Sequence, residues 1–412
     1  MTLVHDGKTG TGEKELELLL TLCRVFLYDR EQDKDRIREL THTGIAWRIF
    51  IRLVNYHRLL PVIYPLLNLL VDFPAALRSR LDKRFEAHKN NSLDKAAETA
   101  RLARLFRSQG IDALCLKGVP LTLRLYDNLF DRHQGDIDFL GRWEDIEKVH
   151  FLLLDQGYNL LSPSRQEIFS SPRAKKVFSK ANVHVNYLHP EHKMRVEFHF
   201  RLFKNPYYFP YDAHDFFQRK RTVSYHRAAI DIPPLPDEDL YLFAHGANHQ
   251  WFRLKWLLDI AMLCRDKETQ WQPLLEKALQ FGLERVVTQG LHLSRHLFAS
   301  PVPAVWENPR FNPPGLSPLV RGALAEVEQS RHEARGEKRS KLPRFGRKTY
   351  LTKLKKGLRY KLYHWRELVF LDANRSVLKL PAVLFPLYYI LNPFLWFYRK
   401  FVMSPKAGVK QP

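Results

Sequence analysis

Cysteine is scarce in this chain of 412 residues, which contains only Cys23, Cys115 and Cys264. Three widely separated thiols exclude a disulfide framework and a zinc knuckle, because both require cysteines in matched sets. We expect each thiol to fill a small buried space. The first fifteen residues also lack the apolar run of a secretory signal peptide, so we expect a reducing, cytoplasmic setting. The sequence has no internal repeat.

Negative charge is also in deficit, since 66 lysines and arginines face 44 aspartates and glutamates, for a net charge of +22. This balance favours anionic partners such as nucleotides, nucleic acid, anionic lipid or acidic polysaccharide, without choosing among them. A solvated basic surface would give the same numbers. Hydrophobic residues make up 45% of the chain, which excludes wholesale disorder and predicts a sizeable core.

The apolar pattern changes twice along the chain. Helical spacing covers 13–28, 43–71 and 74–109, and it returns from Asp237 to about residue 299. Short apolar or alternating stretches between them predict strands at 111–118, 136–140, 183–188 and 194–200, with a helix at 144–156. We therefore expect an α+β fold, with a mixed sheet between helical flanks. The predicted regions are 1–110 (helical), 111–232 (core), 233–300 (helical, completing a site) and 301–412 (Pro-rich loop, basic segment, apolar tail).

Two aspartates in DRHQGDIDFL (131–140) are the first candidate site. On a strand, Asp136 and Asp138 project from one face while Ile137 and Phe139 pack behind it. Carboxylates this close repel each other unless a cation lies between them or water solvates both. Mg²⁺ is commonly bound by one or two carboxylates together with substrate phosphates. The pair therefore predicts a metal site, with a solvated pair as the alternative.

A third carboxylate occurs in RVEFHFR, where alternation places Arg195, Glu197, His199 and Arg201 on one face. A carboxylate on a half-buried strand is unusual unless it is paired or bound to a ligand. Glu197 is therefore the candidate third metal ligand. An ion pair with Arg195 or another arginine is the alternative.

These motifs together resemble a known family. LCLKGVPLTLRLYDNLFDRHQGDIDFL is similar to the Lys-Gly, Arg and Asp-Ile-Asp pattern of a bacterial nucleotidyltransferase-like family in the polymerase-β-type superfamily. The similarity continues through EDIEKVHFLLLDQGY, VEFHFRL and LFAHGANHQWFRLKWLLDIAMLC, and covers roughly 13–300. The resemblance implies a nucleotidyltransferase-type sheet with Mg²⁺, or Mn²⁺, at Asp136, Asp138 and Glu197. It also implies transfer of a nucleoside monophosphate from an NTP, such as ATP, to an acceptor that the sequence does not identify.

The sequence departs from the broader superfamily after the first predicted strand. Typical members have Gly-Ser there, whereas this chain has Lys117-Gly118. A lysine can neutralise phosphate as a point charge, and a glycine lets backbone amides approach it closely. Lys117 could instead be a surface lysine. Arg132 could bind phosphate in a bidentate manner or neutralise the acidic cluster.

The helix predicted from Asp237 supplies weaker candidates. His245 and His249 are four residues apart and share a helical face, and Lys255 follows. With His199, these residues could contact substrate. An aromatic core stripe is an equally simple interpretation. A zinc site is disfavoured because the glutamate of the zincin motif is missing.

The C-terminal region has two features. Residues 338–365 mix basic and aromatic side chains, which is typical of nucleic-acid grooves and of surfaces that bind anionic lipid. Residues 380–398 carry no charge and are long enough to span a bilayer, but three prolines interrupt the run. Lying on a membrane, packing on the core and spanning all remain open. If 338–400 binds lipid, the protein would be peripheral at the inner face of the membrane.

Two other functional classes remain open. A D-x-D pair also binds the metal of sugar-nucleotide donors in glycosyltransferases, although only one clear strand precedes it here. A non-catalytic docking protein for nucleic acid or a membrane surface would need the basic segment but not the carboxylates.

Overall fold

The structure is a computed structural model that describes residues 12–162, 168–169, 171–307, 313–337, 344–369, 378 and 387–401. The chain divides into two compact units, Met1–Lys341 and Leu342–Pro412. The boundaries predicted at 110, 232 and 300 lie inside the first unit, and they remain predictions.

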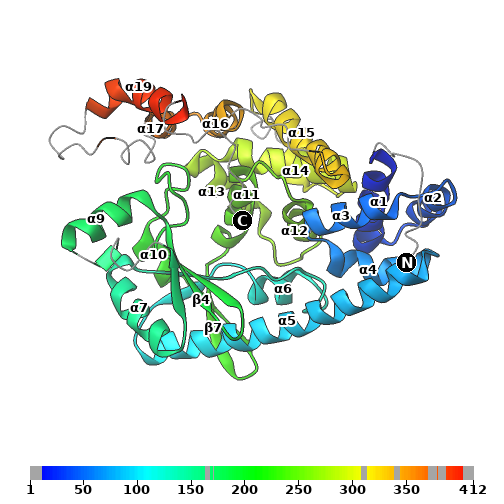
Figure 1. The fold of residues 1–412 in the computed structure, drawn as a ribbon, viewed down its shortest axis with the longest axis horizontal. Helices are drawn as coiled ribbons and strands as arrows, with labels where there is room; N and C mark the ends of the chain where they lie inside the picture. Colours follow the sequence, from blue (N-terminus) through cyan, green and yellow to red (C-terminus); the bar gives the residue numbers. More distant parts are fainter. Residues whose placement is uncertain are drawn as a thin grey trace, which may run out of the picture. The chain divides into compact units, whose positions relative to one another are not determined.

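Five helices open the first unit. They are α1 (Glu13–Tyr28), α2 (Glu31–His42), α3 (Trp47–His57), α4 (Leu60–Leu70) and α5 (Ala75–Ser108). The helical spacing of 13–28 is confirmed, because Leu18, Leu19 and Leu22 are fully buried on one face of α1. Helix α5 begins after Pro74 and leads to Gly110, whose positive φ of 65° reverses the chain. In Figure 1 it runs from the N-terminal helices to the sheet.

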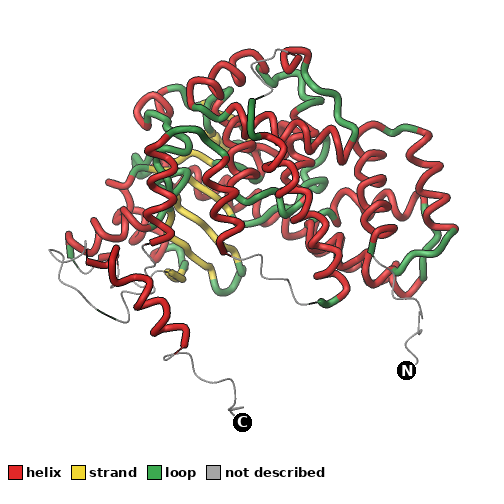
Figure 2. Tube along the Cα trace, turned by 90° about the horizontal axis from the view of Figure 1, so that it is seen from above, coloured by secondary structure: helices red, strands yellow, loops and turns green. Residues whose placement is uncertain are grey.

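The central sheet has five strands in the order β1-β2-β5-β4-β3. They are β1 (Ala113–Cys115), β2 (Ile137–Gly141), β3 (Asn159–Ser162), β4 (His184–His189) and β5 (Met194–His199). Strands β2 and β5 are parallel, and the other pairs are antiparallel. A separate hairpin joins β6 (Arg221–Tyr225) to β7 (Ala228–Ile232). Figure 2 shows the strands side by side with helices around them. The predicted α+β class with a mixed sheet is confirmed.

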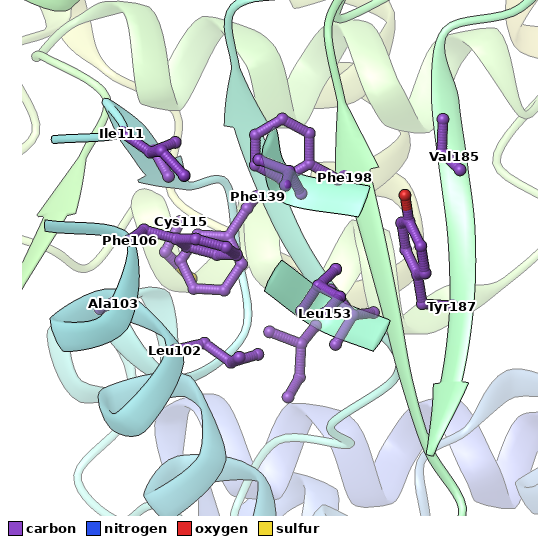
Figure 3. Packing of buried hydrophobic residues seen from close by; sticks show 14 of the residues in the cluster. Leu102, Ala103, Phe106, Ile111, Cys115, Phe139, Leu153, Val185, Tyr187 and Phe198 are labelled. Atoms are coloured by element: carbon purple, nitrogen blue, oxygen red, sulfur yellow. The ribbon is translucent and has the colours of Figure 1, made fainter. Parts of the chain in front are cut away.

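The two faces of the sheet differ sharply in polarity. Phe139 of β2 and Phe198 of β5 are fully buried on one face, where they pack against Phe106 of α5 at ring centroid distances of 5.2 and 5.7 Å. Helix α7 (Ile146–Asp155) contributes Leu153 to the same core (Figure 3). Because side chains alternate along a strand, Asp138 and Glu197 project from the opposite face. The sheet therefore has one apolar core face and one polar face.

Short helices connect the strands of the core. They are α6 (Val119–Leu125), η1 (Trp143–Asp145), α9 (Pro172–Ala181) and α10 (Ala213–Gln218). The chain then continues through α11 (Asp237–Asn248), α12 (Leu254–Leu263), α13 (Trp271–Phe281), α14 (Glu284–Phe298), η2 (Ala304–Glu307) and α15 (Leu316–Arg335).

A buried ionic network fixes α6 against α11. The guanidinium of Arg124 donates to both carboxylate oxygens of Asp239, at 2.7 and 3.0 Å, and to Glu238 and Asp266. These side chains are almost fully buried. Bidentate pairing gives the contact a fixed geometry. The network thus holds α11 beside the turn between β1 and α6, where the candidate site lies.

In the second unit, the described residues include the helices α16 (Arg344–Lys353), α17 (Leu358–Val369) and α19 (Leu387–Phe401). Of the apolar run 380–398, residues 380–386 lie outside the described residues, and the remainder lies in α19. None of the helices in the described part of the chain combines the length and apolar character needed to cross a bilayer.

Candidate active site

Asp138 and Glu197 are paired across two parallel strands. Residues 137–140 of β2 align with 196–199 of β5, and this register places Asp138 directly beside Glu197. Both side chains are largely buried, with 15% and 20% exposed. The sheet thus brings together two of the three predicted metal ligands.

Histidine 199 lies between these two carboxylates. Its Nε2 is 3.4 Å from Oδ1 of Asp138 and 3.3 Å from Oε2 of Glu197. Burial alone would lower the pKa of His199, but the two carboxylates outweigh that effect and raise it. Lys117 is also close to Asp138. Burial alone would raise the pKa of Asp138, but Lys117 and His199 together lower it below its usual value. His199 was predicted as a substrate contact, and the structure places it within the carboxylate cluster.

Asp136 lies at the edge of the cluster, just before β2 begins. It is more exposed than Asp138, and its nearest cation is Arg195, with Nε 3.9 Å from Oδ1. Burial, followed by the negative charges of Glu197 and Asp138, raises the pKa of Asp136. The three predicted metal ligands are therefore close enough to repel one another. The alternative for Glu197, an ion pair with Arg195, is not formed, because Arg195 turns to Asp136.

The Lys117-Gly118 turn lies next to this cluster, between β1 and α6. Gly118 has φ 68° and ψ −131°, a conformation that only glycine adopts readily. Lys117 is only 15% exposed, so it is not a surface lysine. Its Nζ is 3.6 Å from Oδ2 of Asp138 and 3.5 Å from Nδ1 of His245. Burial opposes a charge on Lys117, but Tyr241 and Asp138 together raise its pKa.

Helix α11 lies beside the Lys117-Gly118 turn. Tyr241 packs under Lys117, with Nζ 5.5 Å from the ring centroid, and His245 follows one turn later. Burial and the charge of Lys117 lower the pKa of His245 well below its usual value. His249 lies between His245 and Trp256 in tilted ring contacts, at centroid distances of 4.7 and 5.1 Å. His245 therefore lies beside Lys117 and His249 lies in an aromatic cluster, and contact of either residue with substrate stays a prediction.

A group of cations adjoins the carboxylates. Burial, then the charge of Arg132, lowers the pKa of Lys255 well below its usual value, and Arg58 and Lys117 add to the effect. Lys255 forms no ion pair with any carboxylate in the described part of the chain. Arg58 contacts His133, with NH1 3.2 Å from Nε2. Positive charge in excess of its local partners is typical of a site for a polyanion.

Arg132 has a partner that the sequence did not predict. Its Nε and NH2 donate to the two carboxylate oxygens of Asp259 in α12, at 2.8 and 2.9 Å. Tyr126 also donates to Asp259, at 2.8 Å. All three groups are buried. Arg132 therefore pairs neither with Asp136 nor with Asp138, and instead fixes the loop before β2 to α12.

Sequence reasoning missed three groups at this site. His184 of β4 aligns with His199, and its Nδ1 is 3.7 Å from Oε2 of Glu197. Tyr241 and Arg58 were also not predicted. His184 lies on the same face of its strand as Asn186, so alternation could have shown its orientation but not its neighbours.

Comparison with known proteins assigns the family. Residues 43–299 match a family described as uncharacterised nucleotidyltransferase. The match covers more than half of the chain, so the protein belongs to this family, and the resemblance seen in the motifs is confirmed. No curated protein and no solved structure gives a match.

Proposed function

We propose that this protein is a metal-dependent nucleotidyltransferase that moves a nucleoside monophosphate from an NTP to an acceptor hydroxyl. The observation that carries the proposal is the pairing of Asp138 with Glu197 across β2 and β5, with Asp136 beside them. Membership of a nucleotidyltransferase family supports the general reaction class.

We propose that the carboxylate cluster holds a divalent cation. Burial, followed by the negative charges of Glu197 and Asp138, raises the pKa of Asp136, so these carboxylates repel one another. A divalent ion between them relieves this repulsion. These residues would hold Mg²⁺ or Mn²⁺, which when bound neutralises charge that develops on the phosphate oxygens.

The cations beside the cluster fit the triphosphate. Lys117 is buried next to Asp138, and the Gly118 amide lies in a turn that can approach phosphate closely. Lys255 and Arg58 lie near each other on the side of α12, and a bound phosphate would favour the charged form of Lys255, whose pKa is lowered by burial and by neighbouring cations. Charge-assisted hydrogen bonds from such groups would orient the α-phosphate toward the carboxylates. We assign Arg132 a positioning role, because its guanidinium donates to both carboxylate oxygens of Asp259 in α12.

The reaction follows from this arrangement. The acceptor oxygen forms a bond with the α-phosphorus while the bond from that phosphorus to the bridging oxygen of the β-phosphate breaks. Pyrophosphate leaves with the electron pair of the broken bond. Glu197 would take the proton of the acceptor hydroxyl. His245 and Tyr241 lie beside Lys117, and they would contact the substrate from α11.

Label transfer tests this function. Purified protein is incubated with Mg²⁺, cell extract and each NTP in turn, labelled on either the α- or the γ-phosphate. We expect α-label to appear on an acceptor that mass spectrometry identifies, whereas γ-label leaves in pyrophosphate. Asp138→Asn should abolish the transfer, and Asp155→Asn, at an exposed carboxylate in α7, should not. Transfer of sugar from a nucleotide sugar with Mn²⁺, without NMP transfer, would indicate a glycosyltransferase instead.

A membrane-binding role for the second unit is supported by exposed apolar side chains. Leu358, Leu362 and Trp365 are 70%, 55% and 52% exposed and share one face of α17. Helix α19 exposes Leu387, Ile390, Phe394 and Phe397 at the same kind of spacing. Basic residues lie between them in α17, as Arg359 and Lys361 do. This combination is typical of helices that lie in an anionic lipid interface.

Vesicle sedimentation tests the membrane role. We expect binding to vesicles that contain phosphatidylglycerol, weaker binding to pure phosphatidylcholine, and a loss on Leu362→Asp. Leu93→Asp, at an exposed leucine of α5, is the matched control. Binding to RNA with no binding to vesicles would assign the basic segment to nucleic acid.

A further inference from the structure

We propose that His184, Glu197 and His199 form a binding site for a divalent transition-metal ion. The proposal deepens the proposed function and rests on it, because Glu197 is shared with the carboxylate cluster. This site would bind another class of metal than the carboxylate cluster, because two of its three ligands are imidazoles.

The sheet itself assembles the three ligands. Glu197 and His199 are two residues apart in β5, so they project from the same face. His184 of β4 is the registered neighbour of His199, and the two rings lie 4.7 Å apart between centroids. A nitrogen or oxygen atom from each of the three residues lies within 4.8 Å of the other two. No loop has to move to bring them together.

The spacing of these atoms matches a coordination shell better than a set of hydrogen bonds. Oε2 of Glu197 is 3.3 Å from Nε2 of His199 and 3.7 Å from Nδ1 of His184. Nitrogen and oxygen ligands about 2.0–2.2 Å from a tetrahedral ion lie about 3.3–3.6 Å from one another. A hydrogen bond between a ring nitrogen and a carboxylate would be shorter, at about 2.7–3.0 Å. Asp138 contacts this set from outside, with Oδ1 3.4 Å from Nε2 of His199.

Three of the four ring nitrogens are buried and lack a hydrogen-bond partner among the residues that the structure describes. Nδ1 of His184 and both nitrogens of His199 make no hydrogen bond of normal geometry within the described residues. His199 as a whole is only 8% exposed. A buried polar atom without a partner costs about 1–3 kcal/mol. A metal ion would satisfy Nδ1 of His184 and Nε2 of His199 at once.

The ligand set indicates the class of metal. Mg²⁺ prefers oxygen ligands and keeps several waters, whereas imidazole suits Fe²⁺, Ni²⁺, Cu²⁺ and Zn²⁺. Two imidazoles next to Glu197 should therefore select a transition metal at this position. Asp136, on the other side of the cluster, offers only oxygen. The centre would then combine one nitrogen-rich position with one that suits Mg²⁺.

Cobalt binding tests this site directly, without nucleotide or activity. Co²⁺ is titrated into the full-length protein, and visible d–d absorption is recorded in the presence of excess Mg²⁺. We expect saturable binding that tenfold excess Mg²⁺ does not displace. His184→Gln should weaken the binding 10-fold or more. His189→Gln is the matched control, because His189 belongs to a separate, more exposed group with Glu191 and His192 at the end of the same strand.

A second measurement covers the case in which His184→Gln does not fold. Electron paramagnetic resonance of one equivalent of Cu²⁺ bound to the unaltered protein should show hyperfine coupling to nitrogen. Absence of that coupling, or a cobalt spectrum unchanged by His184→Gln, would overturn the proposal. A metal site that responds to His184→Gln in a protein without NMP transfer would keep this inference and refute the proposed function. Normal NMP transfer without nitrogen coupling would keep the proposed function and refute this inference.

Discussion

Asp138 and Glu197 are direct neighbours on the parallel strands β2 and β5, on the face of the sheet that is turned away from the apolar core. The chain between them forms α7, β3, α9 and β4 before it returns to this position. Strand order therefore brings together two carboxylates that would repel each other in the absence of a cation. The predictions below test the groups around this pair.

Removing the charge of Lys117 should weaken NTP binding. Lys117→Met keeps the length of the side chain but removes the ammonium, whose charge-assisted contact with phosphate we expect to contribute about 1.5–3 kcal/mol. The KM for NTP should rise about 10- to 100-fold, and Lys117→Arg should recover part of the loss. Steady-state kinetics at saturating Mg²⁺ measures both. Lys83→Met, at an exposed lysine in α5, should leave the KM unchanged. An equal effect in both variants would refute the role of Lys117.

Breaking the Arg132–Asp259 pair should affect stability. Asp259→Asn leaves the guanidinium of Arg132 buried without its bidentate partner, since the two side chains are 7% and 4% exposed. Removing one member of a buried ion pair costs about 3–5 kcal/mol. Urea denaturation should show this loss in the free energy of unfolding. The exposed pair between Arg38 and Asp35 is the control, and Asp35→Ala should cost less than about 1 kcal/mol. Similar losses in both variants would contradict a structural role for Arg132.

Gly141 should not tolerate a side chain. It is the last residue of β2, and a Cβ there would overlap the ring of Phe198 in β5, next to Glu197. Overpacking of this kind costs about 1–3 kcal/mol. Gly141→Ala should therefore lower the free energy of unfolding by that amount in urea denaturation. Gly357→Ala has open space around it and should change stability by less than about 0.5 kcal/mol. A stable Gly141→Ala variant would show that the contact between β2 and β5 is looser than described.

His57 should make stability depend on pH. The backbone N–H of Leu254 donates to its Nδ1, so the ring proton lies on Nε2 and is donated to Oγ of Ser330, which donates in turn to the carbonyl of Val327. Burial lowers the pKa of His57 from 6.5 to about 3. The unfolded chain therefore binds the proton first as pH falls. The stability of the neutral form is fully present above pH 6.5 and is lost as pH falls toward 3.

The loss should be about 1.5–2 kcal/mol between pH 6.5 and pH 5, since one unit of pKa corresponds to about 1.4 kcal/mol. His57→Asn removes this titration, so its free energy of unfolding should fall less steeply over that range. Urea denaturation at each pH measures the free energy of unfolding of the unaltered protein and of His57→Asn. The contributions of other titrating groups cancel in the difference between the two. Equal slopes would show that folding does not lower the pKa of His57, and would contradict the prediction.

Much of the fold could be predicted from local pattern. The helix at 13–28 and the strands that carry Asp138 and Glu197 were predicted because their apolar residues repeat at clear helical or alternating spacing. Helix α2 was missed, because its sequence EQDKDRIRELTH buries only Ile37 and Leu40 among its apolar residues. Local pattern identifies a strand or helix only where one face is consistently apolar.

The long-range contacts of the site could not be predicted. Arg132 and Asp259 are 127 residues apart, so nothing near either residue indicates the other. His184 carries no signal until β4 is placed beside β5, because a histidine on a half-buried strand is unremarkable alone. The candidate carboxylates and Lys117 were named from the sequence, whereas the positions of His184 and Arg58 beside them depend on strand order and helix packing.

The central claim is that Asp138 and Glu197 act together in NMP transfer. The most direct test is the rate of α-label transfer from NTP, with Mg²⁺ and cell extract, by the unaltered protein, Asp138→Asn and Glu197→Gln. Loss of several kcal/mol of transition-state stabilisation predicts a fall on the order of 1,000-fold or more in each variant. Circular dichroism and the thermal transition should show that both remain folded. Transfer at the normal rate by either folded variant would contradict the account.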